Sequence, residues 1–136
     1  MSISKKNNIM YIIYAKDQEK SKAFYEEVLG YQPTLHVPGM TEFQLVNHVT
    51  LGIMPEEGIM RVLENKIPHP QDAHGIPRSE LYLFVDDANA YYNRLVQAGG
   101  TGISTKQLRN WGDYVAYGLD QDGHVLAFAE KAEEVK

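Results

Sequence analysis

The sequence predicts an α+β protein made of two consecutive βαβββ modules, and two observations lead to this fold class. A continuously apolar run, typical of a strand covered on both faces, occurs twice, at residues 9–15 and 80–85. Each run is followed by an aspartate that can cap a helix and by a glycine that can end it. Both pairs are 69 residues apart, half the chain: Asp17 and Asp86, Gly30 and Gly99. We therefore expect the 136 residues to form a single domain built from two halves.

The first module is expected over residues 9–54. It begins with the strand Ile9–Ala15, and a helix capped by Asp17 follows and ends at Gly30. Turn residues at Pro38-Gly39 and Asn47-His48 then divide the remainder into strands. The three strands are Tyr31–Val37, Thr41–Val46 and Val49–Met54.

The second module is expected over residues 80–130 and repeats this order. After the strand Glu80–Val85, Asp86 or Asp87 caps a helix that Gly99-Gly100 closes. Three more strands are predicted: Thr101–Gln107, Tyr114–Leu119 and Val125–Glu130. We interpret the acidic segment Glu130–Lys136 as a solvated end.

A proline-rich linker is expected between the modules, over residues 55–79. Four of the six prolines lie in it. Within the linker, Ile59, Leu63 and Ile67 are spaced by four residues, which predicts two helical turns over Ile59–Ile67.

Composition excludes several classes of protein. With 43% apolar and 23% charged residues the chain is typical of a soluble globular protein, and the absence of cysteine removes disulfides and thiolate metal sites and fits a reducing cytoplasm. A net charge of −5, with scattered basic residues, argues against a nucleic-acid partner. Charged residues directly follow the first apolar run, where a secretory signal would have a cleavage site of small residues. No apolar run approaches the roughly 20 residues that span a bilayer. We therefore expect a cytoplasmic protein with no membrane partner.

Several motifs together resemble one known family. They are Lys20–Tyr25, Val28–Tyr31, Glu80–Asp87, Ala98–Gly100, Trp111-Gly112 and Asp120–Gly123. In this order, across about 120 of the 136 residues, they resemble a small bacterial-type single-domain member of the glyoxalase, bleomycin-resistance and extradiol-dioxygenase superfamily, also called vicinal-oxygen-chelate. One departure is Gln121, where the family usually has proline. The resemblance implies that the two modules form an open eight-stranded cup and that the chain is a homodimer.

The resemblance also implies where a divalent metal ion would bind. Counting from the capping aspartates and the last turn places the four ligand positions at Met10, Glu80, Ala127, and Leu51 or Gly52. Only Glu80 can bind a metal, and a single carboxylate holds a divalent cation weakly. The five histidines lie at strand ends, in the linker or beside a turn, and we interpret them as solvated. The sequence thus predicts no metal site and no cofactor, although a divalent metal is not excluded.

The cup is expected to have an aromatic lining. Strand alternation puts Glu80, Tyr82 and Phe84 on one face, and the repeat puts Met10, Ile12 and Tyr14 on the equivalent face. The last strand contributes Ala127, whose small side chain leaves room. The resemblance places Tyr117 toward the cup, where alternation alone allows Tyr114 equally, and Trp111 at the rim. The predicted ligand-binding residues are Tyr14, Glu80, Tyr82, Phe84, Trp111, Tyr117 and Ala127.

Two alternatives concern single groups in this lining. The aromatic side chains either bind a flat molecule or simply fill the core between the modules. Glu80 is either an exposed glutamate near Arg78 or, if it is buried, a candidate general acid or base, since burial would raise its pKa.

Three functions follow from these expectations. The first is a protein without the family metal site that binds a small aromatic or cationic molecule in an apolar cup. The second is a metal-dependent lyase, isomerase or dioxygenase of the same superfamily whose rearranged site uses Glu80. The third is a dimeric interaction module whose cup is filled.

Overall fold

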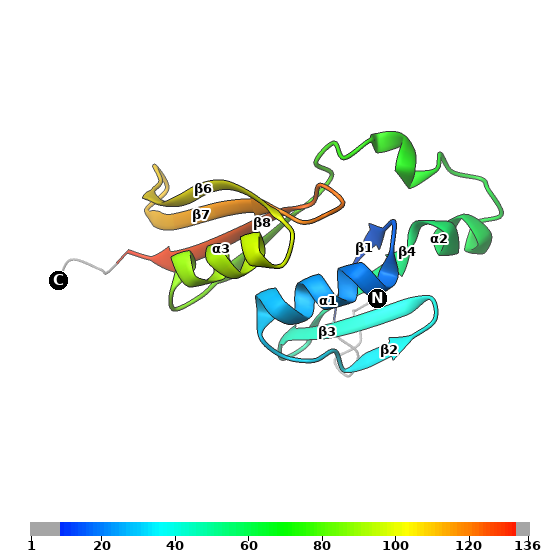
Figure 1. Ribbon diagram of the computed structural model, residues 1–136, viewed down its shortest axis with the longest axis horizontal. Coiled ribbons are helices and arrows are strands. Elements are labelled where there is room, and N and C mark those ends of the chain that lie inside the picture. The colour runs from blue at the N-terminus through cyan, green and yellow to red at the C-terminus, as the bar shows by residue number, and fades with distance from the viewer. Residues whose placement is uncertain (1–8, 133–136) are drawn as a thin grey trace, which may run out of the picture. The chain divides into compact units, whose positions relative to one another are not determined.

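The computed structural model describes residues 9–132, and these residues form two compact units (Figure 1). The first unit comprises the residues up to Glu26 and Gly30–His74, and the second comprises Glu27–Leu29 and the residues from Gly75 onward. Among the described helices, none is both long and apolar enough to cross a membrane.

The first unit is built on a four-stranded sheet with the order β1-β4-β3-β2. Its first strand pairs in parallel with its last, and the other neighbours are antiparallel. The strands are β1 (Ile9–Ala15), β2 (Leu35–Val37), β3 (Met40–Val46) and β4 (Val49–Pro55).

Helix α1 (Gln18–Leu29) covers one face of this sheet. It begins as predicted at Asp17, whose carboxylate accepts a hydrogen bond from the backbone N–H of Lys20 at 3.1 Å, and it ends at Gly30 in the left-handed conformation. The buried ring of Tyr25 lies 6.4 Å from that of Phe43 on β3. Since side chains alternate along a strand, Met10, Ile12 and Tyr14 lie on the face away from α1.

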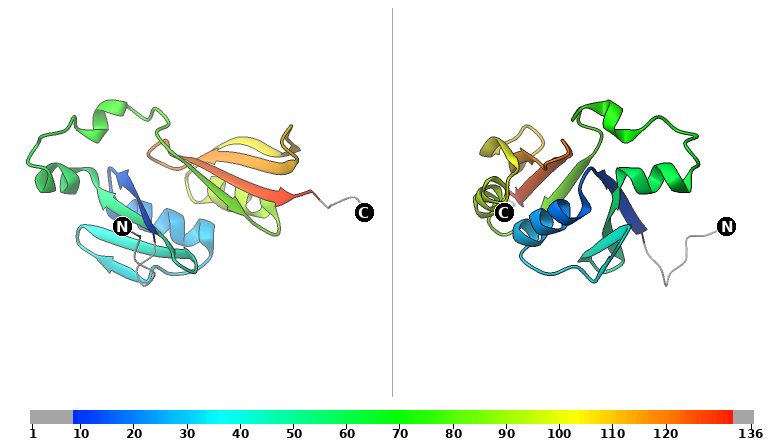
Figure 2. Two further views of the ribbon diagram at one scale, coloured as in Figure 1. Left: turned by 180° about the vertical axis from the view of Figure 1, so that it is seen from behind. Right: turned by 45° about the vertical axis from the view of Figure 1, so that its right-hand side comes forward.

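The second unit repeats this topology with the order β5-β8-β7-β6 (Figure 2). Strand β5 is again parallel to the last strand, β8, and the other pairs are antiparallel. The elements are β5 (Glu80–Phe84), α3 (Ala88–Gln97), β6 (Thr101–Leu108), β7 (Asp113–Leu119) and β8 (Val125–Lys131). The predicted α+β class, with two βαβββ modules, is confirmed.

Helix α3 covers one face of the second sheet. Its N-terminus is capped by Asp87, the second of the two predicted candidates, through the backbone N–H of Ala90 at 3.1 Å. The Tyr91 ring lies 5.4 Å from the Phe128 ring on β8. Leu95 packs so closely over Gly118 that a Cβ atom built there would lie 2.7 Å from the leucine methyl carbons. Glycine at this position therefore allows the helix to approach β7.

The predicted linker helix over Ile59–Ile67 is wrong in its bounds. Helix α2 spans Glu56–Val62, and a short 3-10 helix follows at Pro70–Ala73. The helix begins directly after Pro55, with two glutamates in its first turn, and the left-handed backbone of Glu64 and Asn65 ends it before Ile67.

The interpretation of Glu130 as part of a solvated tail is also wrong. Glu130 lies in β8, and its side chain is only 23% exposed. Its carboxylate accepts hydrogen bonds from the backbone N–H of Ala88 at 2.8 Å and from the Lys106 ammonium at 3.2 Å. Glu130 thus links β8, β6 and the first turn of α3.

Candidate functional site

The face of the second sheet that points away from α3 carries the predicted lining residues of that module. Strand pairing aligns Tyr82 on β5 with Ala127 on β8, and Ala127 with Tyr117 on β7. Residues that are paired directly, and every second residue along a strand, share a face. We call this surface the aromatic face and define it by its members: Glu80, Tyr82, Phe84, Asp113, Val115, Tyr117, Val125, Ala127 and Ala129.

Tyr117, rather than Tyr114, belongs to the aromatic face. Tyr117 pairs with Ala127, whereas Tyr114 pairs with Glu130 on the side of the helix. Strand alternation alone could not distinguish these tyrosines, because it puts them on opposite faces without showing which face points away from the helix. The register of β7 against β8 resolves the ambiguity in favour of the position that the family resemblance implied.

Three small or branched side chains form the floor of the aromatic face. Val115, Ala127 and Ala129 are fully buried, and Tyr82 and Tyr117 pack against them. Because Tyr82 and Tyr117 lie on strands that flank β8, their backbones are separated by two strand spacings, about 10 Å. Because Ala127 is fully buried, the side chains packed against it, including the two tyrosines, already cover its methyl group.

The hydroxyl group of Tyr82 connects two residues of the β6–β7 hairpin. It accepts a hydrogen bond from the Trp111 indole N–H at 2.9 Å and donates one to the Asp113 carboxylate at 2.7 Å. The tip of the hairpin turns back through Gly112, which has a φ of 102° that favours glycine. Trp111 is therefore attached to the aromatic face through Tyr82, while the residue remains 56% exposed.

Both tyrosines on the aromatic face are held in the neutral form. Burial raises the pKa of Tyr82 above its ordinary value of 10.0, and the hydrogen bond to Asp113 raises that pKa further against the opposing effect of Trp111. Burial also raises the pKa of Tyr117, with the negative charge of Glu80 as the next largest cause. These phenols can donate hydrogen bonds and offer ring faces, but they are poor candidates for a tyrosinate base near neutral pH.

Phe84 and Glu80 lie at the more exposed parts of the aromatic face. The Phe84 ring is 56% exposed, stands edge-on to Tyr82 at 5.3 Å and lies 5.1 Å from the Lys131 ammonium. Glu80 is also exposed, so the predicted alternative of a buried general acid or base loses its physical basis. Its carboxylate is placed instead as a charge beside the tyrosines.

Sequence reasoning missed two charged residues at this site, Arg109 and Asp113. Asp113 occupies the same alternation as Val115 and Tyr117, so the strand pattern could have placed it on the aromatic face had the strand been started one residue earlier. Arg109 lies beyond the end of β6, and its guanidinium carbon stands 5.0 Å from the centre of the Tyr117 ring. No periodicity reaches a residue in a hairpin tip, which is why Arg109 could not be found.

Tyr14 is the one predicted lining residue in the first unit. It is half-buried and pairs with Met54, on the face of the first sheet away from α1. Met10 and Ile12 share that face and are partly exposed, as the repeat predicts.

The register of the first sheet settles which residue corresponds to Ala127. Ile12 pairs with Gly52 as Tyr82 pairs with Ala127, so Gly52, and not Leu51, occupies the equivalent position. Leu51 points instead toward α1 and is buried.

The residues at the family's four metal-ligand positions do not fit a metal ion. Neither Gly52 nor Ala127 has a side-chain donor. A Cβ built at Gly52 would lie 3.0 Å from both the Met10 sulfur and an Ile12 carbon, so the neighbouring side chains already occupy the space a longer residue would need. Within residues 9–132, no group of three or more His, Cys, Asp or Glu side chains is arranged to hold a metal ion.

The interpretation of the histidines as solvated is wrong for His124. This residue is only 5% exposed, its Nδ1 lies 3.1 Å from the Ser79 hydroxyl, and its backbone N–H donates to the buried Asp120 carboxylate at 2.9 Å. The histidine thereby joins the start of β5 to the turn before β8. Its role is to fix the turn.

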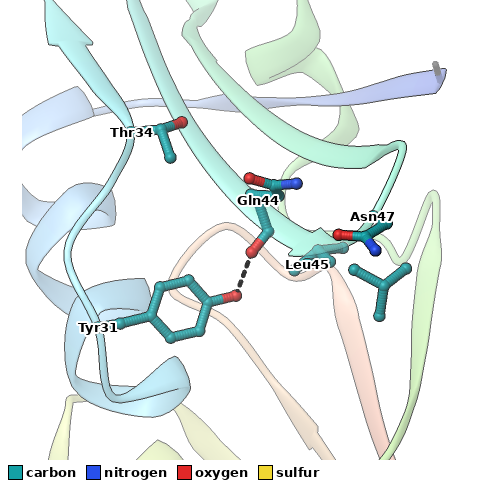
Figure 3. A pocket seen from close by; sticks show the side chains of 6 residues that line it. Tyr31, Thr34, Gln44, Leu45 and Asn47 are labelled. Carbon is teal, nitrogen blue, oxygen red and sulfur yellow. Dashed lines mark hydrogen bonds between the residues drawn. The ribbon is translucent and has the colours of Figure 1, made fainter. Parts of the chain in front are cut away.

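The first unit also has a surface hollow of about 360 Å³ at the end of β3 (Figure 3). The Tyr31 hydroxyl donates to the backbone oxygen of Gln44 at its edge, at 2.5 Å. The lining residues are Tyr31, Thr34, Gln44, Leu45, Val46 and Asn47. This lining contains no carboxylate, imidazole or ammonium group, so it is a weaker candidate for chemistry than the aromatic face.

Comparisons with known proteins agree with this architecture. Residues 7–128 match the family model described as the glyoxalase/bleomycin resistance protein/dioxygenase superfamily. A search of curated proteins finds no match.

Solved structures with the same fold include three from bacteria named for this family. A glyoxalase-related enzyme from Fulvimarina pelagi has a TM-score of 0.76 and 22% identity, over 90% of this chain and 86% of that one. A glyoxalase/bleomycin resistance protein/dioxygenase from Nocardioides has a TM-score of 0.75 and 19% identity, over 99% and 89%. A family enzyme from Burkholderia phytofirmans has a TM-score of 0.71 and 20% identity, over 90% and 96%. At these identities the likeness shows the fold alone.

Proposed function

Because this chain belongs to the glyoxalase/bleomycin resistance protein/dioxygenase superfamily, we propose that it binds a small aromatic or cationic molecule on its aromatic face, without the metal site of the family's enzymes. The observation that carries this proposal is the pair of tyrosines that flank Ala127 over a buried aliphatic floor. Flat ligands bind well to such surfaces, since the partly exposed aromatic residues above the covered floor offer ring faces for apolar contact.

The residue proposed to bind a cationic group of the ligand is Glu80. Its carboxylate lies on the same face as Tyr82 and close enough to Tyr117 to influence the pKa of that phenol. A cationic group on a ligand would gain from this carboxylate and from the electron-rich faces of the tyrosine rings.

The test is a thermal-shift screen of aromatic and cationic compounds, followed by titration of the best cationic compound against the Glu80→Gln variant. We expect a saturable increase in the melting temperature and, because the carboxylate is exposed, an affinity about twofold to fivefold lower for the variant. Asp86→Asn, a matched change of an exposed acid that lies outside the aromatic face, should bind like the wild type. Equal affinity of the Glu80→Gln variant and the wild type would contradict the role of Glu80.

The competing function is a metal-dependent lyase, isomerase or dioxygenase with a rearranged site. Elemental analysis of protein purified without chelators separates the two. Stoichiometric zinc, nickel, manganese or iron would overturn the proposal and make Glu80 a candidate ligand. A metal content well below one equivalent, together with ligand binding unaffected by chelator, would support it.

We further propose that the chain is a homodimer in the cytoplasm. Support comes from β1, which is the edge strand of its sheet and is apolar along its length, with Ile9 and Tyr11 more than half exposed. An apolar edge strand of seven residues without charge or proline is normally covered by another chain or element.

A further inference from the structure

Arg109 carries a charge that no carboxylate in the described part of the chain neutralises. Its Nη2 donates to the Ser104 hydroxyl at 2.8 Å and to the backbone oxygen of Val115 at 2.9 Å. Its Nε is buried and has no hydrogen-bond partner. None of the ion pairs formed among residues 9–132 includes Arg109.

A half-buried guanidinium without a carboxylate partner is well placed to bind an anion, since burial removes water from its charge. The enclosed Nε of Arg109 is not open to a ligand, and Arg94 has an equally enclosed Nε without a partner. The remaining donors of Arg109 are those of Nη1, from which a carboxylate can accept charge-assisted hydrogen bonds.

The position of Arg109 places that missing anion on the aromatic face. The guanidinium carbon lies 5.0 Å from the centre of the Tyr117 ring, and Ser104, which holds it, is paired with Tyr117 in the β6–β7 ladder. Glu80 lies on β5, at the other border of the sheet. The aromatic face therefore has the Arg109 guanidinium at the β6–β7 hairpin, where the Asp113 carboxylate already accepts from Tyr82, and the Glu80 carboxylate at the border formed by β5.

Resting on the proposed function, we infer that the ligand of the aromatic face is a planar compound that carries a carboxylate, which binds the Arg109 guanidinium while the ring of the ligand packs against the ring of Tyr117. The amine that Glu80 favours lies at the opposite end, so a compound whose amine and carboxylate are on opposite sides of one ring satisfies both borders. The two charged borders thus select ligands by the separation of their charges as well as by their ring.

The experiment compares four compounds that share one benzene ring: benzyl alcohol, phenethylamine, phenylacetate and 4-(aminomethyl)phenylacetate. Binding is followed by NMR titration and by the fluorescence of Trp111, the single tryptophan of the chain. We expect phenylacetate to bind about tenfold more tightly than benzyl alcohol, as a hydrogen-bonded charge pair allows. The Arg109→Gln variant should lose this preference and keep its affinity for benzyl alcohol.

Arg94 provides a matched control. It too stacks on a tyrosine, with its guanidinium carbon 4.1 Å from the Tyr91 ring, but it lies on α3 and not on the aromatic face. The Arg94→Gln variant should bind all four compounds like the wild type. If Arg109→Gln does not fold, it is replaced by Arg109→Lys, which keeps the positive charge and loses the planar set of guanidinium donors. The comparison of phenylacetate with benzyl alcohol in the wild type remains decisive.

The outcomes separate this inference from the proposed function. Equal binding of phenylacetate and benzyl alcohol by the wild type, with both responding at Trp111, would overturn the role of Arg109 and leave the aromatic face as a binding site. If phenethylamine alone binds, the anion inference is likewise overturned and the proposed function is supported. No response to any compound of the series would overturn both.

Discussion

At the scale of single residues, the Tyr82 hydroxyl is the most connected group of the candidate site. It is acceptor for Trp111 and donor to Asp113, so one oxygen holds the hairpin tip against the sheet. Trp111 lies in the turn before β7, and Asp113 is the first residue of that strand. The hydroxyl of Tyr82 therefore ties the turn to β5.

Replacing Tyr82 by phenylalanine removes both hydrogen bonds and retains the ring. We expect a loss of about 1 kcal/mol in the free energy of unfolding, since the partners can regain water, and a change in Trp111 fluorescence. Urea unfolding and emission spectra measure the two effects. Tyr114→Phe, at a more exposed position on the opposite side of β7, is the control and should change neither.

The raised pKa values of Tyr82 and Tyr117 predict a loss of stability in alkali. In the unfolded chain both phenols titrate near 10.0, whereas in the folded chain they hold their protons to higher pH. Above about pH 10 the unfolded state therefore binds fewer protons, and the free energy of unfolding decreases as the pH rises toward the folded pKa values. Below pH 10 this contribution is fully present.

Urea unfolding at a series of alkaline pH values tests this dependence. The Tyr82→Phe and Tyr117→Phe variants should each show a shallower decrease than the wild type. A decrease of unchanged slope in both variants would assign the alkaline instability to other groups.

At the scale of elements, helix α3 approaches its sheet through glycine. Because a Cβ at Gly118 would lie 2.7 Å from the methyl carbons of Leu95, Gly118→Ala forces the leucine or the helix to move. We expect a loss of about 1 to 3 kcal/mol in the free energy of unfolding, measured by urea denaturation.

Gly58 in α2 is the matched control for this substitution. A Cβ there would meet no atom closer than 3.6 Å, which is ordinary contact, and Gly58→Ala should be neutral or stabilise the chain by up to about 1 kcal/mol. Similar losses for both alanine variants would mean that close packing at Gly118 is not the cause.

The elements also show what the sequence could predict and what it could not. Asp17 and Gly30 bound α1 as expected, because capping depends on local hydrogen bonds and on one residue's backbone conformation. The bounds of α2 were missed, since the spacing of Ile59 and Ile67 says nothing of the left-handed residues that end the helix. Glu130 was misplaced because its partners Ala88 and Lys106 are distant in sequence.

The candidate site, too, could be predicted from the sequence only in part. Alternation placed Tyr82, Phe84 and Ala127 on one face, since that periodicity is a local property of a strand. The choice of Tyr117, the choice of Gly52 over Leu51 and the presence of Arg109 all depend on the register between strands or on a turn. Register arises from contacts between distant segments, which no single stretch of sequence contains.

At the scale of the whole molecule, the proposed dimer follows from the apolar edge of β1. We expect light scattering during size-exclusion chromatography to give twice the mass of one chain. Introducing a charge at the exposed edge, as in Tyr11→Lys, should shift the mass toward that of one chain. The Tyr114→Lys variant, a similar change on β7, should keep the mass of the wild type.

The parallel pairing of the first and last strand in each module has a consequence for how the chain reaches its fold. Ile9 pairs with Val49, and Glu80 pairs with Val125. The first strand of each module therefore cannot pair with its partner by forming a hairpin. Pairing these strands closes a loop of about 40 to 45 residues in each module, a step whose entropy cost depends on the length of chain between the strands. During synthesis, the first module therefore becomes complete only when β4 has emerged, and it can do so before any strand of the second module exists.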